Sequence, residues 1–122
     1  MSLKSLDQER AAFAWKCALD GKSDKYVNLA KSAPALIMQN GLMQTLAFLE
    51  GKGKDEHKAI VRHIVEWLRD RQIVDRADFG AAMAQLHGGE SDRYMRATDE
   101  ALEILRWIRQ FAPAICDGKG DR

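Results

Sequence analysis

The sequence predicts an all-α fold, a compact single-domain bundle of about six helices, some of them short. Ala (17) and Leu (12) outnumber Val, Ile and Thr together (13) more than twofold, and that balance favours helix over strand. Only two prolines interrupt the chain, and its 122 residues are too few for two autonomous cores. We therefore expect one helical domain over residues 1–122, with flexible ends at 1–4 and 117–122.

The first predicted helix begins at Ser5 and ends near Asp20. Ser5 and Gln8 have the spacing of a capping box, in which each side chain satisfies a backbone donor of the other residue. Apolar residues lie on two opposite sides of this helix, which predicts a core helix with two neighbours. The alternative is that the side carrying Trp15 is a docking surface, so Trp15 is a candidate partner-binding residue.

Two short helices are expected next. One contains Tyr26 and ends before Pro34, because Ser32 can cap a new segment with proline in its first turn. The second covers 34–39, and Asn40-Gly41 is a stop signal because both residues tolerate the left-handed conformation.

Residues 42–49 are apolar almost all round and are expected to form a buried helix, with Phe48 in the core. Gln44 and Thr45 are its only polar residues, and we expect them to satisfy buried backbone groups. After it, Gly51-Lys52-Gly53-Lys54 is a flexible basic joint without the spacing of a phosphate-binding loop.

Three longer helices complete the prediction. The first covers 55–71, the second is capped by Asp75 and extends to Leu86, and the third covers 91–112. Apolar residues recur at helical spacing in each of them, which indicates one buried face per helix.

Charge and cysteine content narrow the function classes. A formal net charge of +1 excludes a strongly basic nucleic-acid binder, so any polyanion contact must be a local patch. Cys17 and Cys116 are too few for a disulfide framework or a four-ligand zinc site, which favours a reducing, cytoplasmic location. No apolar run approaches the ~20 residues that span a bilayer, and we expect no membrane partner.

No catalytic signature is present, and we expect a protein that is not an enzyme and holds no metal or cofactor. His57 and His63 lie six residues apart, which on a helix separates them by about 240°, so they cannot share a metal ion. His63 falls on the polar arc beside Asp70 and is expected to be a solvated surface residue.

The basic residues are informative through their arrangement. Three of them fall within about 40° of one helical wheel, and two more in the preceding joint could extend the stripe along a phosphate backbone. The alternative, which charge pattern alone favours, is a solvated face on which Glu66 and Asp70 pair with neighbouring arginines. The candidate RNA-binding stripe comprises Lys58, Arg62 and Arg69, extended by Lys52 and Lys54.

Two pairs in the last helix, Arg96 with Glu100 and Glu103 with Arg106, have the spacing of local ion pairs. We interpret these arginines as structural.

Two segments resemble a known family. They are QERAAFAW at 8–15 and ALIMQNGLMQTLAFL at 35–49, and the second is the more specific. Together they are similar to the small helical subunit of the type III-B CRISPR effector, the Cmr (RAMP module) complex. Roughly the first 50 residues carry this resemblance.

The resemblance implies a non-catalytic subunit that packs in copies along an RNA-guided filament. Its implied partners are the backbone subunits, the polymerase-like large subunit, further copies of itself, and the crRNA with its target RNA, held through basic surface. Arg10 belongs to the first matching segment and is a candidate contact to nucleic acid or to a neighbouring subunit. The alternatives are a stand-alone helical nucleic-acid-binding regulator and a protein–protein adaptor.

Overall fold

The computed structural model describes residues 4–116, and all regular structure within that range is α-helical, which confirms the predicted fold class. The bounds of the six helices are α1 Leu6–Gly21, α2 Asp24–Asn40, α3 Leu42–Lys52, α4 Asp55–Asp70, α5 Phe79–Gly88 and α6 Ser91–Cys116. The predicted flexible ends, apart from Lys4, lie outside the described residues. The single-domain assignment stays a prediction.

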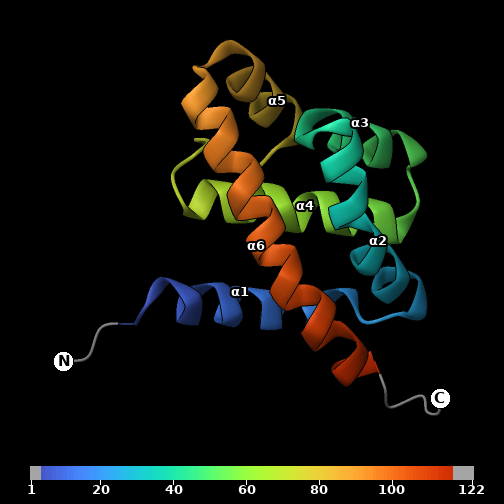
Figure 1. Cartoon of the computed structure of the whole chain (residues 1–122). Coiled ribbons are helices and arrows are strands. Elements are labelled where there is room, and N and C mark those ends of the chain that lie inside the picture. Colours follow the sequence, from blue (N-terminus) through green and yellow to red (C-terminus); the bar gives the residue numbers. More distant parts are fainter. Residues whose placement is uncertain (1–3, 117–122) are drawn as a thin grey trace.

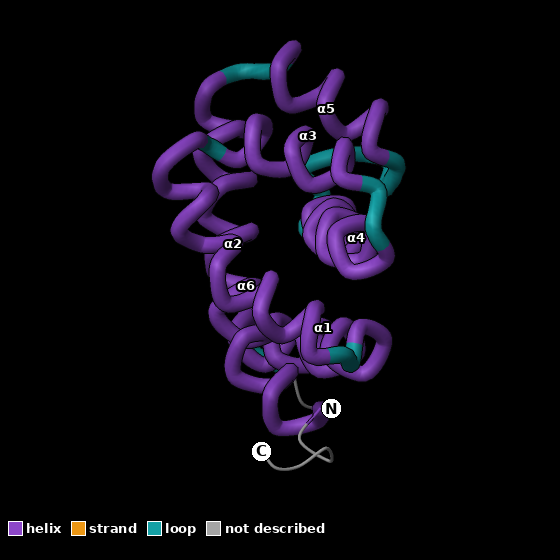
Figure 2. Tube along the Cα trace, turned by 90° about the vertical axis from the view of Figure 1, so that its right-hand side faces the viewer, coloured by secondary structure: helices purple, strands orange, loops and turns teal. Residues whose placement is uncertain are grey.

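Helix α6 crosses the molecule and contacts each of the other five helices. Figure 1 shows it passing in front of α4 and α1, and Figure 2, turned by 90°, looks almost along the axis of α4. The core lies where these helices cross, because the inward residues of α4 and α6 have essentially no exposed surface. Those residues include Ile60, Ile64, Leu68, Ile104 and Ile108.

The capping box at the start of α1 is confirmed. The Ser5 Oγ accepts the Gln8 N–H at 3.1 Å, and the Gln8 Oε1 accepts the Ser5 N–H at 2.8 Å. On the inner side of α1, Ala14, Cys17 and Ala18 are buried against α6 and α4. The expected core helix with two neighbours is therefore present.

Helix α2 corrects the prediction of two short helices, because it continues through Pro34. Ser32 caps nothing, and its hydroxyl donates to the Leu29 carbonyl at 3.2 Å instead. The true cap is Ser23, whose side chain accepts the Tyr26 N–H at 3.1 Å. A proline inside a helix costs about 3 kcal/mol, and the buried face on either side of Pro34, which packs against α6 and α4, outweighs that cost.

Gly41 forms the corner between α2 and α3, which confirms the stop predicted at Asn40-Gly41. Its φ of 88° lies in the region that favours glycine, and its N–H donates to the Ile37 carbonyl at 2.8 Å. The Tyr94 hydroxyl from α6 accepts the backbone N–H of Met43, in the first turn of α3, at 3.1 Å. A fixed corner therefore places α3 beside α2.

Helix α3 corrects the expectation that residues 42–49 are buried on all sides. Leu42, Leu46 and Leu49 have no exposed surface, but Phe48 is 54% exposed. Gln44 is exposed as well, and the buried Thr45 hydroxyl has no hydrogen-bond partner among residues 4–116, so the expectation that both satisfy buried backbone groups is wrong. The reason is position: α3 packs on α2 and α4 from one side and presents its other face outward.

Helix α5 begins later than predicted. Asp78 is its N-cap and accepts the Ala81 N–H at 3.0 Å, whereas Asp75 caps nothing. Asp75 is instead held by Gln85, through bonds of 2.7 Å and 2.9 Å. The contact with Gln85 thus replaces the capping role that the sequence pattern predicted for Asp75.

Helix α6 extends past the predicted end at residue 112 to Cys116, with Pro113 inside it. No helix in residues 4–116 is both long enough and apolar enough to cross a membrane.

Candidate functional site

The candidate RNA-binding stripe lies on the exposed face of α4. Lys58, Arg62 and Arg69 are each about half exposed, as expected from their shared sector of the helix. The structure therefore brings these three side chains to one face. Lys52 and Lys54 are exposed at the junction of α3 and α4, and the Lys52 ammonium lies 5.1 Å from the centre of the Phe48 ring.

Acidic side chains neutralise much of this stripe. Each of the three α4 cations has a carboxylate within ion-pair distance. Two of these carboxylates, Glu50 and Asp20, belong to other helices. The pairs are Lys58 with Glu50 at 3.3 Å, Arg62 with Asp20 and, at 3.9 Å, with Glu66, and Arg69 with Asp70 at 3.3 Å. A phosphate must compete with these carboxylates, which weakens any contact made by one molecule.

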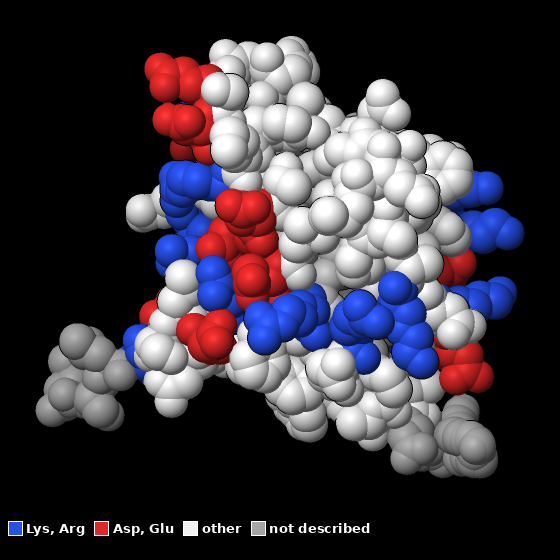
Figure 3. Space-filling view, viewed as in Figure 1, with Lys and Arg blue, Asp and Glu red and all other residues white. Residues whose placement is uncertain are grey.

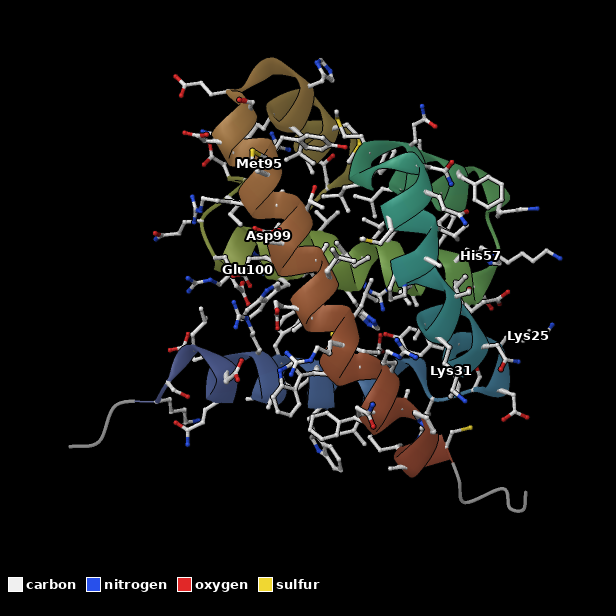
Figure 4. The ribbon with its side chains drawn as sticks, viewed as in Figure 1. Lys25, Lys31, His57, Met95, Asp99 and Glu100 are labelled. Atoms are coloured by element: carbon white, nitrogen blue, oxygen red, sulfur yellow. The ribbon has the colours of Figure 1, made fainter. Side chains whose placement is uncertain are left out.

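Arg10 is engaged within the fold. Its Nε lies 3.2 Å and its Nη2 2.8 Å from the two carboxylate oxygens of Glu100, and only 16% of the Arg10 side chain is exposed. The indole Nε1 of Trp67 donates to the same carboxylate at 3.0 Å. Arg10 on α1, Trp67 on α4 and Glu100 on α6 thus form what we call the α1–α4–α6 junction, with Glu100 marked in Figure 4.

The electrostatics of this junction favour the ionised pair. Burial opposes the charge of Glu100, but the hydrogen bonds from Arg10 and Trp67 outweigh it and hold the pKa of that carboxyl below its usual range. Glu100 pairs with Arg10 of α1 and not with Arg96, so the expected local pair is wrong. The other expected pair, Glu103 with Arg106, is present at 2.9 Å. Within the fold, Arg10 is a structural residue.

His63 is not a surface residue, contrary to expectation. It is 3% exposed, with Nδ1 2.7 Å from the Tyr26 hydroxyl and Nε2 2.8 Å from Asp20 Oδ2. Because a carboxylate only accepts, Nε2 carries the proton in neutral His63 and Nδ1 accepts from Tyr26. Burial lowers the pKa of His63, although the hydrogen bond to Asp20 opposes that shift.

The sequence held a signal for this burial. His63 lies three residues after Ile60 and four before Trp67, on the apolar side of the same helix.

Trp15 lies on an exposed apolar surface. Its side chain is 45% exposed, as is that of Leu19 one turn further along α1, and its ring meets Phe111 of α6 edge-on at 5.2 Å. We call Trp15, Leu19 and Phe111 the aromatic face. One side of α1 is therefore core and the other is open, and the role of Trp15 as a partner-binding residue stays a prediction.

A hollow of about 240 Å³ lies between α2 and α3, and the sequence did not indicate it. Its lining residues, here called the α2–α3 groove, are Leu36, Asn40, Gln44, Thr45 and Phe48. Thr45 is 2% exposed, and its Oγ1 is buried without a hydrogen-bond partner among the residues of the structure. Gln44 and Phe48, four residues apart, share one face of α3, but Leu36 and Asn40 belong to α2, so the periodicity of a single helix does not indicate the groove.

A second basic surface was also missed. Lys31 on α2 and Arg109 on α6 are exposed, and neither forms an ion pair within the described residues 4–116. Figure 3 shows Lys and Arg side chains side by side across the lower part of this face, and Figure 4 marks Lys31 there. The signal was the absence of any Asp or Glu from 25–49 and from 104–116.

Two observations concern metal and thiol chemistry in the described chain. No group of three or more His, Cys, Asp or Glu side chains in residues 4–116 could hold a metal ion. Cys17 is buried, and burial raises the pKa of its thiol, which disfavours the reactive thiolate.

Comparisons with known proteins agree on one family. A family model described as CRISPR-associated protein (Cas_Cmr5) matches residues 6–115. "CRISPR system Cmr subunit Cmr5" of Thermus thermophilus is 33% identical over 93 residues, 76% of each chain. The protein of the same description from Thermotoga maritima is 27% identical, over 98% of this chain and 91% of its own.

A solved structure supports the same assignment. The crystal structure of a CRISPR-associated Cmr5 family protein from Thermus thermophilus aligns with a TM-score of 0.76 and 28% identity. The alignment covers 92% of this chain and 97% of that one.

Proposed function

The chain belongs to the Cas_Cmr5 family of CRISPR-associated proteins, and we propose on that premise that it is a non-catalytic small subunit of a type III-B CRISPR Cmr complex. The observation that carries the proposal is the family match over residues 6–115, nearly the whole helical body. In this proposal the chain works in the cytoplasm and leaves bond breaking to other subunits. Turnover of RNA or nucleotide by the isolated chain would contradict it.

The proposed partners are the backbone subunits, the polymerase-like large subunit, further copies of the chain, and the crRNA with its target. Affinity purification of the tagged chain from its native source tests this assignment. We expect other Cmr subunits and a guide RNA in the eluate. Elution of the chain without either would contradict the proposed function.

We propose further that basic surface helps to hold the RNA. The leading candidates are the α4 stripe of Lys58, Arg62 and Arg69 with Lys52 and Lys54 beside it. The ion pairs on α4 predict weak binding per molecule, which copies arrayed along one strand would strengthen through effective concentration. Arg10 contributes to RNA binding only if its pair with Glu100 opens.

The two basic surfaces can be compared directly. Fluorescence anisotropy with labelled single-stranded RNA, titrated with salt, is run on the triple variant Lys58→Ala, Arg62→Ala, Arg69→Ala and on the double variant Lys31→Ala, Arg109→Ala. We expect the triple variant to bind less tightly and with a flatter salt dependence, because fewer phosphates are neutralised. Arg76→Ala, which removes an exposed arginine outside both surfaces, is the control.

Unchanged binding by the triple variant, with weaker binding by the double variant, would place the RNA contact on the second basic surface, at Lys31 of α2 and Arg109 of α6. Circular dichroism establishes that each variant remains helical, so that lost binding is not lost fold.

A further inference from the structure

One carboxylate oxygen links an exposed cation of the α4 stripe to a buried histidine. Asp20 Oδ2 lies 2.8 Å from His63 Nε2, and the same oxygen accepts from the Arg62 guanidinium. Asp20 belongs to the last turn of α1, where the chain turns towards α2 (Figure 1). The Arg62 side chain is 46% exposed and that of His63 only 4%. A ligand that pairs with Arg62 at the surface therefore acts one atom away from a ring that solvent barely reaches.

His63 is the member of this network that can change its charge near neutral pH. The network extends from Tyr26 through His63 and Asp20 to Arg62. Burial raises the pKa of Tyr26, so its hydroxyl stays neutral. The hydrogen bond from His63 holds the pKa of the Asp20 carboxyl below its usual range, so Asp20 stays ionised. A proton taken up by these four side chains therefore goes to the imidazole.

The titratable and charged groups around His63 come from three helices. They are Tyr26 from α2, Lys16, Cys17 and Asp20 from α1, and Arg62, Glu66, Arg69 and Asp70 from α4 itself. Burial lowers the pKa of His63, the hydrogen bond to Asp20 opposes that shift, and the positive charge of Arg62 adds to it. An anion that neutralises Arg62 therefore raises the proton affinity of His63.

The structure provides a place for such an anion. A hollow of about 360 Å³ is lined by both Asp20 and His63, and its cations are Lys16, Arg62 and Arg69. Two of these cations belong to the α4 stripe. A phosphate group that enters the hollow competes with Asp20 for Arg62 and brings its own negative charge close to the imidazole.

We propose that binding of an RNA phosphate at Arg62 is coupled to the uptake of a proton by His63, through the Asp20 carboxylate that the two side chains share. This inference rests on the proposed function, because it assigns a linked proton to the RNA contact of the α4 stripe. The coupling is reciprocal, as linkage requires. Protonated His63 binds the carboxylate more strongly and repels Arg62, which frees the guanidinium for phosphate. The affinity for RNA therefore increases as the pH falls and His63 takes up its proton.

NMR of the imidazole rings over a pH series tests the coupling in the absence of RNA. The chain has three histidines, so the spectra of His57→Gln and His87→Gln assign the His63 ring by elimination. The titration midpoint of His63 is then compared between the wild type and Arg62→Gln. Because Arg62 is exposed, this variant keeps the core intact.

The expected result follows from the charge that Arg62→Gln removes. At a separation of about 4 Å in water, two unit charges interact strongly enough to change an equilibrium about fivefold. We therefore expect His63 of the variant to bind its proton about fivefold more tightly. Lys58→Gln is the matched control, because it removes a stripe cation that pairs with Glu50 and not with Asp20, and it should leave the midpoint unchanged.

The linked proton is then measured with RNA. Fluorescence anisotropy with labelled single-stranded RNA, at pH 7.5 and 5.5 and one ionic strength, gives the ratio of the two affinities. We expect the wild type to bind up to about fivefold more tightly at pH 5.5 and His63→Gln to lose that gain. Glutamine can donate to Asp20 and accept from Tyr26, but it takes up no proton. His57→Gln removes a ring that pairs with Glu56 outside the hollow, and it should gain as the wild type does.

Two results would overturn the inference and leave the proposed function standing. One is a midpoint of His63 in Arg62→Gln equal to that in the wild type. The other is an affinity gain in His63→Gln as large as that of the wild type. Failure of the wild type to bind RNA at either pH would overturn the RNA contact of the α4 stripe as well.

Circular dichroism at each pH excludes unfolding as the cause of lost binding. If His63→Gln does not fold, the NMR comparison with Arg62→Gln still decides the coupling. Co-purification with Cmr subunits and guide RNA is independent of these measurements, so the assignment to the complex is tested separately.

Discussion

The α1–α4–α6 junction and the α2–α3 groove differ in how their buried polar atoms are hydrogen-bonded. At the junction, one carboxylate receives hydrogen bonds from a guanidinium and an indole of two other helices. In the groove, the buried Thr45 hydroxyl has no hydrogen-bond partner among residues 4–116, and the Phe48 ring that also lines the groove is half exposed. A buried polar group is thus shared by three helices at the junction, whereas the one between α2 and α3 contributes no tertiary hydrogen bond among residues 4–116.

The strongest test of this contrast is Glu100→Ala. The change removes the carboxylate that the Arg10 guanidinium and the Trp67 indole share, and within residues 4–116 it leaves Arg10 only its pairs with the exposed Asp7 at 3.0 Å and with Glu103 at 4.0 Å. We expect a loss of about 3 kcal/mol in the free energy of unfolding. Urea denaturation followed by circular dichroism measures it. Glu103→Ala, which removes a more exposed carboxylate one turn away, should cost less than about 1 kcal/mol. Equal losses for both variants would show that the junction does not hold the three helices.

A second pair of substitutions compares core and groove on α3. Leu46→Ala truncates a fully buried side chain and should cost about 2–5 kcal/mol. Phe48→Ala, two residues on, should cost less than about 1 kcal/mol because the ring is 54% exposed in the single chain. Thermal denaturation of the two variants measures the difference. A large loss for Phe48→Ala would restore the sequence-based expectation that this ring is buried.

The smallest expected effect concerns pH and His63. The pKa of His63 is lowered in the fold, so the unfolded chain takes up a proton first as the pH falls. The contribution of His63 to the free energy of unfolding is therefore fully present above about pH 6.5. It is lost as the pH falls from there towards the lower pKa of the folded state. The groups that face the imidazole are Tyr26 from α2, Asp20 and Cys17 from α1, and Arg62 and Glu66 from α4 itself.

Protonation would also make Nδ1 a donor, leaving the Tyr26 O–H without its acceptor. Thermal midpoints at pH 7.5 and 5.5, for the wild type and for His63→Gln, check this prediction. The variant retains His57 and His87 and should show a smaller drop. If the thermal midpoint of the variant fell as far as that of the wild type, protonation of His63 would not be the cause of the loss.

Local chemistry made much of the fold predictable. The capping box at Ser5 and the stop at Gly41 depend on residues within one turn, and both are present. Pro34 and Asp75 were misassigned because each has a plausible local role that tertiary packing overrides. Periodicity identifies an apolar face but does not say which neighbour covers it, so Phe48 was placed inside and His63 outside.

The candidate surfaces were predictable to a similar degree. Helical geometry placed the three α4 cations on one face correctly, but it could not show that Asp20 and Glu50 reach them from other helices. Trp15 was identified as a candidate because α1 is apolar on two sides. The groove depends on how α2 and α3 meet at Gly41, which no single segment encodes.

The position of α6 after the other five helices has a consequence for synthesis. The residues 91–116 contact every other helix, yet they are the last of the described segments to leave the ribosome. Until they emerge, the inner sides of α1, α2 and α4 lack the element that covers them, and chaperones have apolar surface to bind. A ribosome stalled before residue 91 should carry a nascent chain that proteases cut readily, and release of the last segment should make it resistant.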